Sequence, residues 1–256
     1  MNYTTSPARK QSSFIPRTLD LLAPEERHQF DEGVSIPAYL EETYWWAYVR
    51  PYAISFFDHE WIVNLILLGN MAKLRDMALD ALGSSIHGRT LQIASIYGDF
   101  SERLVERIAE GGSLDIVDVV PAQLENVRRK LSPSVPVQLL QRDSTALNKI
   151  EDATYDQVIL FFLLHEMPAK VREKTLSEAL RVLKPEGKLV IVDFHKPIAL
   201  NPFRYLYPPM FMLLEPFALD IWNESVQEWL PTDFVPAEVT GETIFGGLYQ
   251  KVVIRK

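Results

Sequence analysis

The chain has 256 residues, 47% of them hydrophobic, so it is long enough to bury a sizeable core as one large domain or as one domain with an N-terminal cap. Its formal net charge of −8 argues against sequence-independent binding to nucleic acid, which requires a concentrated positive surface. Because the chain has no cysteine, a disulfide framework, a thiolate metal site and a cysteine nucleophile are excluded.

The N-terminal stretch, residues 1–35, is expected to be weakly structured. Residues 1–13 lack the apolar core of a secretory signal, so we expect no such signal. The longest uncharged apolar runs, 61–72 and 205–214, are shorter than the roughly 20 residues that span a bilayer. We therefore expect a chain that does not cross a membrane.

Between residues 36 and 84 the pattern becomes helical, and we predict a helical cap close to the substrate. Pro37 suits the first turn of a helix. Residues 61–82 predict a second, longer helix that is ended by Gly83. The cap is rich in aromatic rings that suit a flat substrate, although core packing is a common alternative. The predicted substrate contacts in the cap are Tyr44, Trp45 and Tyr48.

From residue 85 to the end at 256, short apolar runs alternate with helical segments, which is typical of a parallel sheet covered on both faces. The predicted strands are residues 90–94, 113–119, 137–141, 157–163 and 188–194. The predicted helices are residues 100–109, 121–131 and 170–182, and runs 234–242 and 247–254 are predicted to add antiparallel strands. This alternation predicts an α/β, doubly wound, Rossmann-like fold with its site at the carboxyl ends of the strands.

Two aspartates at predicted strand ends are candidates for binding a nucleotide cofactor. Asp118 ends the second strand, about 20 positions after Gly98, where a carboxylate accepts hydrogen bonds from ribose hydroxyls. Asp143 follows the third strand and is placed to receive the exocyclic amine of an adenine. Taken singly, each is also explained as a turn or N-cap aspartate. The two together, with the Gly98 turn, favour a cofactor.

Five motifs carry a resemblance to a known superfamily: residues 90–100, Asp118, 141–143, 155–158 and 181–188. Together they resemble the class I S-adenosylmethionine (SAM)-dependent methyltransferases across roughly residues 85–256. Residues 192–197 resemble the ubiquinone and menaquinone C-methyltransferases. Residues 39–52 and the altered loop 92–98 resemble the rhodoquinone biosynthesis protein family, RquA.

The resemblance to RquA implies that a methoxy group of ubiquinone is replaced by an amino group, with SAM as nitrogen donor and with a manganese requirement in anaerobic metabolism. It implies SAM contacts at Gln92, Ala94, Ser95, Tyr97, Gly98, Asp118, Val119, Asp143 and Ser144.

The glycine-rich loop departs from the methyltransferase pattern in ways that fit this chemistry. Neutral Gln92 stands where methyltransferases have an acid that holds the methionine ammonium. Without a carboxylate partner the amine loses its proton more easily, as a nucleophilic nitrogen must. Ala94 and Ile96 stand where glycines are usual. Because Ile cannot adopt positive φ without strain, we expect the loop conformation to change there.

Candidate chemical groups follow the fourth and fifth predicted strands. We predict His165, Glu166 and His195 as catalytic residues, and Glu166, Asp193 and His195 as candidate metal ligands. A divalent metal, manganese by the resemblance, would lower the amine pKa or polarise a quinone carbonyl. The structural alternatives are that His195 packs under the following loop and that Glu166 caps the helix starting near Pro168.

Residues 197–222 form an apolar segment with few charges. We predict that it dips into the bilayer interface or lines a channel for an isoprenoid tail, with Tyr205 as a substrate contact. A buried helix or a dimer face explains the segment equally well. We expect peripheral contact with the cytoplasmic face of the bacterial inner membrane, or with the mitochondrial inner membrane in a eukaryote.

Two other functions remain open from the sequence. One is a conventional SAM-dependent methyltransferase acting on a quinone or another small apolar substrate. The other is a catalytically silent assembly subunit on the same scaffold. The altered loop argues against the first, and the two strand-end aspartates argue against the second.

Overall fold

The computed structural model describes residues 33–132 and 137–256, so the predicted N-terminal segment 1–35 lies almost wholly outside the described residues. The described strands form one sheet of order β3-β2-β1-β4-β5-β7-β6. Their bounds are β1 Arg89–Ile93, β2 Ser113–Asp118, β3 Val137–Gln141, β4 Tyr155–Phe161, β5 Leu183–Phe194, β6 Glu238–Ile244 and β7 Tyr249–Arg255.

The predicted doubly wound sheet is confirmed. Strands β1 to β5 pair in parallel, and β7 and β6 add the antiparallel C-terminal edge. Most strand boundaries differ from the predicted ones by a few residues, and the largest difference is in β5, which begins at Leu183 rather than at residue 188 because Leu183 pairs with Tyr155 across a register shift. The strand order reverses between β1 and β4, so a crevice is expected at their carboxyl ends.

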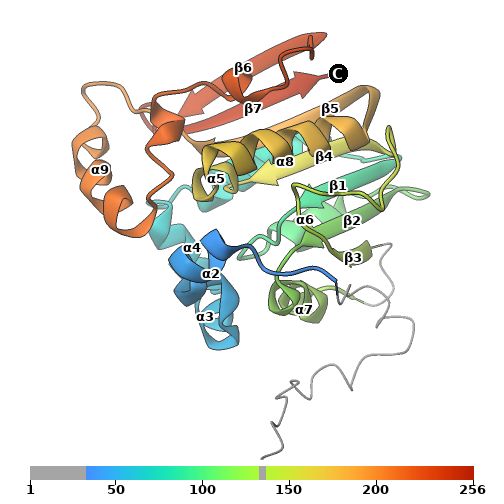
Figure 1. Cartoon of the computed structure of the whole chain (residues 1–256), viewed down its shortest axis with the longest axis horizontal. Coiled ribbons are helices and arrows are strands. Elements are labelled where there is room, and N and C mark those ends of the chain that lie inside the picture. The colour runs from blue at the N-terminus through green and yellow to red at the C-terminus, as the bar shows by residue number, and fades with distance from the viewer. Residues whose placement is uncertain (1–32, 133–136) are drawn as a thin grey trace, which may run out of the picture.

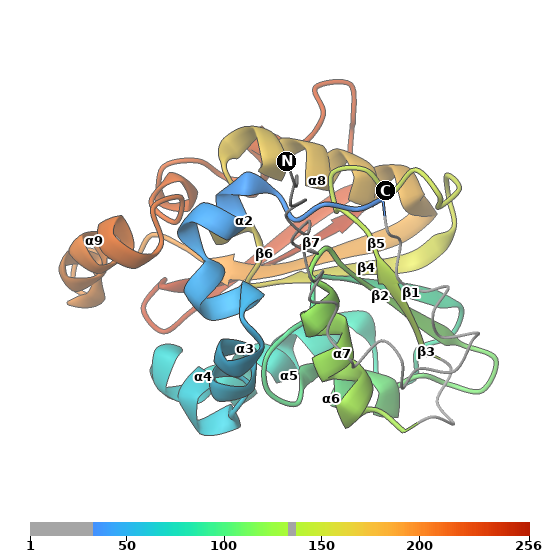
Figure 2. The ribbon, with the colours of Figure 1, turned by 60° about the horizontal axis from the view of Figure 1, so that its bottom comes forward.

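Helices cover both faces of the sheet, as Figure 2 shows. Helix α8 (Ala169–Val182) lies on one face, and α5 (Met71–Leu82), α6 (Phe100–Glu106) and α7 (Pro121–Lys130) lie on the other. Helix α9 (Phe203–Leu214) stands to the side of the sheet (Figure 1). None of the described helices is long and apolar enough to span a bilayer.

The long helix predicted over residues 61–82 is wrong. The chain forms α4 (Glu60–Ile66) and α5 instead, separated by a turn in which Leu68 has φ 53° and Gly69 has φ 78°. The Asn70 side-chain amide donates to the carbonyl groups of Leu67 and Leu68 and holds this turn. A left-handed glycine ends a helix readily, so Gly69 interrupts a pattern that is otherwise continuously apolar.

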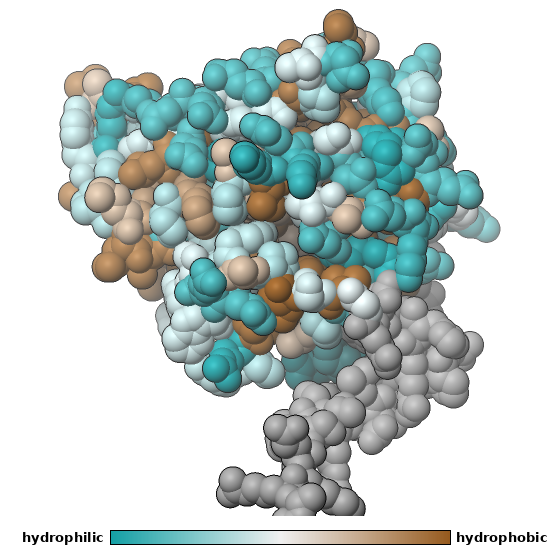
Figure 3. All heavy atoms as spheres, in the orientation of Figure 1, coloured by the Kyte–Doolittle hydropathy of each residue, from teal (hydrophilic) through white to brown (hydrophobic). Residues whose placement is uncertain are grey.

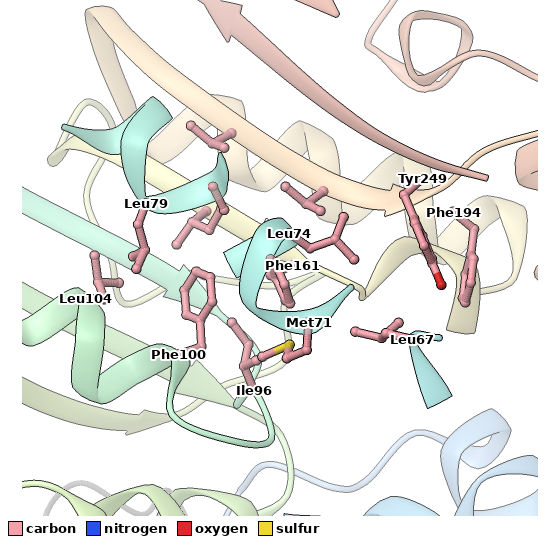
Figure 4. Packing of buried hydrophobic residues seen from close by; sticks show 14 of the residues in the cluster. Leu67, Met71, Leu74, Leu79, Ile96, Phe100, Leu104, Phe161, Phe194 and Tyr249 are labelled. Atoms are coloured by element: carbon pink, nitrogen blue, oxygen red, sulfur yellow. The ribbon is translucent and has the colours of Figure 1, made fainter. Parts of the chain in front are cut away.

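Helix α5 belongs with the sheet rather than with the predicted cap, which was expected to extend to residue 84. Its apolar residues recur at helical spacing, and Leu74 and Leu79 are buried against the core (Figure 4). Figure 4 shows Phe100 and Phe161 beside these leucines. Residues 71–82, which were predicted to belong to the cap, therefore form one of the helices that pack on the sheet.

The remaining cap is formed by α2 (Ala38–Thr43), a π-helical turn (Trp45–Val49), α3 (Pro51–Phe57) and α4. Two contacts fix this cap to the carboxyl ends of the strands. The Tyr97 hydroxyl donates to the Ala47 carbonyl at 2.7 Å. Lys130 Nζ donates to Asp58 and to the Gly98 carbonyl, both at 2.7 Å. The cap therefore covers the crevice that the strand order predicts.

Candidate active site

A cavity of about 690 Å³ lies at the carboxyl ends of the parallel strands, between the cap and α9. Its size is within the range of cofactor and substrate pockets. The segments that follow β1, β2, β3 and β4 all contribute to its wall, which is mostly apolar. The site predicted from strand topology therefore exists as one continuous space.

The altered loop after β1 keeps a left-handed turn without the usual glycine. Ala94 has φ 72° and its N–H donates to the Val117 carbonyl at 2.8 Å. Ile96 is buried and is not among the described residues with positive φ, which agrees with the expectation that the loop does not take a left-handed conformation at this residue. The strained conformation lies two residues earlier, at a residue whose small side chain tolerates it better.

Two predicted cofactor contacts, Gln92 and Gly98, do not line the cavity. Gln92 is fully buried; its Nε2 donates to the Ala94 carbonyl at 2.9 Å and its Oε1 accepts from Ser101 Oγ at 3.0 Å. Both polar atoms of the amide therefore stabilise the loop itself. Gly98 lies next to Met71 and donates its N–H to Asp58. The structure thus does not support direct contact of Gln92 with a ligand amine.

The other predicted cofactor contacts do line the cavity: Ala94, Ser95, Tyr97, Asp118, Val119, Asp143 and Ser144. Asp118 accepts hydrogen bonds from the N–H groups of Ser95 and Val120, both at 2.8 Å. Burial raises the pKa of Asp118, although these backbone hydrogen bonds oppose the shift. Asp143 accepts from the backbone and hydroxyl of Thr145. Each carboxylate retains acceptor positions for a ligand.

A buried imidazole and carboxyl lie at the end of β4, on the short 3-10 helix Leu164–Glu166. His165 Nδ1 donates to Asp193 Oδ1 at 2.8 Å, and His165 Nε2 lies 3.8 Å from Glu166 Oε1. Burial lowers the imidazole pKa, but the charge and hydrogen bond of Asp193 outweigh it and raise the pKa of His165 to about 9. Burial raises the pKa of Glu166 to about 8, against the opposing charge of His165. At neutral pH both groups therefore retain a proton.

Glu215, which directly follows α9, was not predicted and also lines the cavity. Its Oε2 is buried without a hydrogen-bond partner. Burial raises its pKa, which the nearby charge of His165 opposes. A sequence signal was present, because Glu215 is one of very few charged residues in the apolar segment 197–222. Glu215 thus places a carboxyl group of segment 197–222 in the same cavity wall as His165 and Glu166.

His195 lies apart from the other predicted catalytic residues. Its Nδ1 is hydrogen-bonded to the Gly247 carbonyl at 2.8 Å, and it does not line the cavity. His195 is therefore held by the turn between β6 and β7 and not by a group of the cavity wall. Alternation along a strand would put residues 193 and 195 on the same side, but β5 ends at Phe194, so His195 no longer follows the alternation of the strand.

The predicted metal ligands Glu166, Asp193 and His195 are not brought together. Asp193 accepts four hydrogen bonds, from the N–H groups of Leu164, His165 and Phe194 and from the His165 ring. A carboxylate offers about four acceptor positions, so Asp193 has none left for a metal. Within residues 33–132 and 137–256, no group of three histidines or acids is arranged to hold a metal.

Of the predicted aromatic contacts, only Tyr48 lines the cavity. Tyr44 is fully buried, whereas Trp45 and Tyr205 are exposed, and none of the three lines the cavity. Tyr48 stacks on Tyr97 with ring centroids 5.8 Å apart. The aromatic residues that were not predicted as substrate contacts and do line the cavity are Tyr39, Trp46, Phe57, Phe161, Phe162, Phe194, Phe203, Tyr207 and Phe211. Trp45 and Trp46 both lie in the π-helical turn, and Trp46 is the one that lines the cavity.

The cavity opens between α4 and α9. Five apolar side chains are both exposed and part of its wall: Leu65 and Ile66 on α4, and Leu206, Met210 and Leu214 on α9. Further exposed apolar residues extend the surface beyond the mouth, notably Met212 (72% exposed) and Leu213 (80% exposed). Figure 3 shows apolar atoms gathered over α9. The predicted alternative of an ordinary buried helix is therefore wrong for α9.

Sequence comparison relates the core of the chain to quinone methyltransferases. Residues 91–187 match the family model of a methyltransferase domain. The chain is 31% identical over 147 residues to the ubiquinone/menaquinone biosynthesis C-methyltransferase UbiE of Haemophilus ducreyi, covering 56% of this chain and 55% of that protein. It is 29% identical over 181 residues to the demethylmenaquinone methyltransferase of Renibacterium salmoninarum, covering 66% and 72%. The chain thus spans about half the length of the first curated relatives it matches.

Structural comparison supports the same fold at low sequence identity. A SAM-dependent methyltransferase from Aquifex aeolicus superposes with a TM-score of 0.52 at 19% identity, covering 80% of this chain and 98% of that one. An O-methyltransferase described as putative, from Nostoc punctiforme, gives a TM-score of 0.55 at 19% identity, covering 74% and 58%.

Proposed function

Because the chain has the class I SAM-dependent methyltransferase fold and a core related to the quinone C-methyltransferases, we propose that it uses SAM to modify the ring of ubiquinone. In this proposal a ring methoxy group is replaced by an amino group, giving rhodoquinone, with SAM as nitrogen donor. One observation carries the proposal. A single cavity joins Asp118 and Asp143 to the buried His165 and then to an apolar mouth.

The strand-end residues suit the adenosine part of SAM. Asp118 and Asp143 line one region of the cavity with acceptor positions for ribose hydroxyls and an adenine amine. Ser95 Oγ is buried in the same region without a partner, as expected for an atom that awaits a ligand. When bound, SAM supplies either its α-amine nitrogen or its methyl group.

The opposite region of the cavity suits a quinone ring with a long apolar tail. Tyr48 and Phe57 offer aromatic surface to a flat ring. The mouth between α4 and α9 gives an isoprenoid tail an apolar exit. Exposed side chains on α9 support peripheral insertion into the membrane that stores the quinone, which we propose to be the bacterial inner membrane on its cytoplasmic face or the mitochondrial inner membrane.

The protonation of the cavity wall supports amino transfer over ring methylation. Ring methylation needs an electron-rich hydroquinone carbon, which negative charge on the ring oxygen favours. Amino transfer needs an electron-poor quinone, which hydrogen-bond donors to its carbonyl favour. Since His165 and Glu166 retain protons at neutral pH, this wall offers donors. They would stabilise the negative charge that develops on a ring oxygen when a nucleophile adds.

The relatives favour a second candidate, conventional methyl transfer to a quinone ring, because they include a ubiquinone/menaquinone biosynthesis C-methyltransferase and a demethylmenaquinone methyltransferase. A catalytically silent subunit is the third. The manganese requirement implied by the resemblance stays a prediction, and its predicted ligands 166, 193 and 195 do not fit a shared ion in this arrangement.

Mass analysis of the quinone after incubation with SAM and the purified chain separates the three candidates. Amino transfer replaces a methoxy group by an amino group, whereas methyl transfer adds one methyl group to a demethylated precursor. A silent subunit changes neither substrate. The proposal requires the first product from ubiquinone, and it fails if only the second is formed or if no product appears.

A further inference from the structure

Gln123, in the first turn of α7, is a buried cavity residue with an unusual hydrogen-bond pattern. It is 4% exposed and lines the cavity. Its Nε2 donates to the Tyr97 hydroxyl at 2.8 Å and to the Tyr48 carbonyl at 3.3 Å. Its Oε1 is buried and has no hydrogen-bond partner. The amide nitrogen is therefore hydrogen-bonded within the protein, and the amide oxygen is not.

The orientation of the amide follows from its neighbours. The Tyr48 carbonyl can only accept, so the amide atom that faces it must be the nitrogen. The Tyr97 hydroxyl already donates its proton to the Ala47 carbonyl, so it too requires a donor from Gln123. Reversing the amide would place two acceptors against the Gln123 oxygen. The unpartnered atom is thus the carbonyl oxygen, which needs an N–H or O–H donor.

The position of Gln123 points to the amino-acid tail of the cofactor. Asp118 and Asp143 already offer acceptors to the adenosine part. Gln123 is bonded instead to Tyr97, which belongs to the altered loop after β1. The Gln92 amide on that strand is fully used by Ala94 and Ser101 and does not reach the cavity. Gln123 therefore offers a neutral acceptor beside the loop, whereas Ser95 Oγ, which also lacks a partner, belongs to the residue whose N–H is bonded to Asp118.

We propose that the Gln123 carbonyl oxygen accepts a hydrogen bond from the α-amine of bound SAM, and that Gln123 is thereby a cofactor-binding residue. This inference rests on the proposed function for the presence of SAM. A neutral acceptor holds an amine without the charge that keeps it protonated, which suits a nitrogen donor. Because Nε2 of the same side chain is bonded to the loop and to the cap, Gln123 contacts all three partners at once.

The test compares two variants with two ligands by calorimetry. The ligands are S-adenosylhomocysteine and its analogue in which hydrogen replaces the α-amine. Q123M removes the amide while keeping the length of the side chain. Y97F is the matched control, since it removes the oxygen that Gln123 bonds but leaves the Gln123 carbonyl in place. We expect Q123M to weaken binding of S-adenosylhomocysteine about tenfold and to leave binding of the analogue within about twofold. Y97F should change both affinities by the same factor.

Equal losses for both ligands in Q123M would overturn the proposal, because they would assign Gln123 to the ribose or to a structural role. No loss for either ligand would overturn it as well. If Q123M does not fold, NMR of the wild-type chain gives the same decision: the Gln123 side-chain amide must shift with S-adenosylhomocysteine and not with the analogue. If calorimetry or NMR contradicts the expected pattern while the chain still converts ubiquinone to its amino derivative, the assignment of Gln123 is wrong and the proposed function stands. If the wild-type chain binds neither ligand, the proposed function falls with it.

Discussion

Asp193 accepts the Nδ1–H of His165 at 2.8 Å and so directs Nε2 of the imidazole toward Glu166, 3.8 Å away. The other three hydrogen bonds of Asp193 come from backbone N–H groups, which hold the carboxylate rigidly in place. The histidine is thus fixed in orientation and kept protonated by one buried acid. This arrangement suits a donor that stabilises negative charge developing on a substrate oxygen.

We expect H165Q to lower the turnover number about 10²–10³-fold, the usual loss when one preorganised donor is removed from a developing charge. The KM for SAM should change little. His195 provides a matched control, because it is bonded to the Gly247 carbonyl and lies outside the cavity wall. H195Q should keep turnover within about twofold in steady-state assays of the quinone product. Equal losses in the two variants would contradict the assigned role of His165.

The stability of the fold should fall as the pH rises, because two buried groups bind protons more tightly in the folded chain. The pKa of His165 is raised from 6.5 to about 9, so its contribution is complete below pH 6.5 and is lost as the pH rises through about 9. The pKa of Glu166 is raised from 4.5 to about 8, so the folded carboxyl keeps its proton where the unfolded one ionises. The unfolding free energy should therefore decline from about pH 4.5 to about pH 9.

Urea unfolding at a series of pH values measures this decline. E166Q keeps the shape of the side chain and cannot ionise, so it should remove the decline between pH 4.5 and 6.5 and make it shallower between 6.5 and 8. The decline due to His165, between pH 6.5 and about 9, should remain. A variant with the same pH dependence as the wild-type chain would show that Glu166 ionises normally in the fold.

Ala94 should tolerate glycine and not a β-branched residue. Its φ of 72° lies in the left-handed region, where branching at Cβ is costly. We expect A94V to destabilise the fold by about 1–3 kcal/mol. In A94G the relief of strain and the added freedom of the unfolded chain roughly cancel, so stability should stay within about 1 kcal/mol. Denaturant unfolding of both variants checks this, and an A94V variant as stable as A94G would refute a left-handed turn at this position.

The exposed face of α9 should determine membrane binding. Replacing Met212 and Leu213 together by serine removes two strongly exposed apolar side chains that are not part of the cavity wall. Each buried apolar side chain is worth about 1.5–3 kcal/mol, so partial insertion makes a loss of at least tenfold in liposome sedimentation the expected result. Val235 is 85% exposed and lies away from α9 in sequence, so V235S is the control. If both proteins sediment like the wild-type chain, α9 is not the contact.

The sequence predicted the sheet and much of the cofactor region well, because both depend on local patterns. Apolar runs and short turns are enough to place Asp118 and Asp143 at strand ends, and the structure confirms both at the cavity wall. His165 and Glu166 were found by the same reasoning. His195 was assigned wrongly, because its role depends on a contact with the distant Gly247 carbonyl that no local pattern reveals.

The cap was the least predictable part. Gly69 alone marks the break between α4 and α5, and a single glycine in an apolar run is a weak signal. Trp45 and Trp46 are adjacent in a π-helical turn, and the sequence does not distinguish Trp46, which lines the cavity, from Trp45, which does not. Gln123 has no distinguishing motif, Glu215 has only its charge within the apolar segment 197–222, and only tertiary packing brings the two to the same wall.

A labelling experiment that identifies the transferred group tests whether SAM donates its α-amine nitrogen or its methyl group. SAM carrying one isotope at the α-amine nitrogen and another at the sulfonium methyl is incubated with the chain and ubiquinone, and the quinone product is analysed by mass spectrometry. If the chain catalyses amino transfer, the nitrogen label appears in the ring, the methyl label does not, and one methoxy group is lost. A product that carries the methyl label and no nitrogen label would contradict amino transfer.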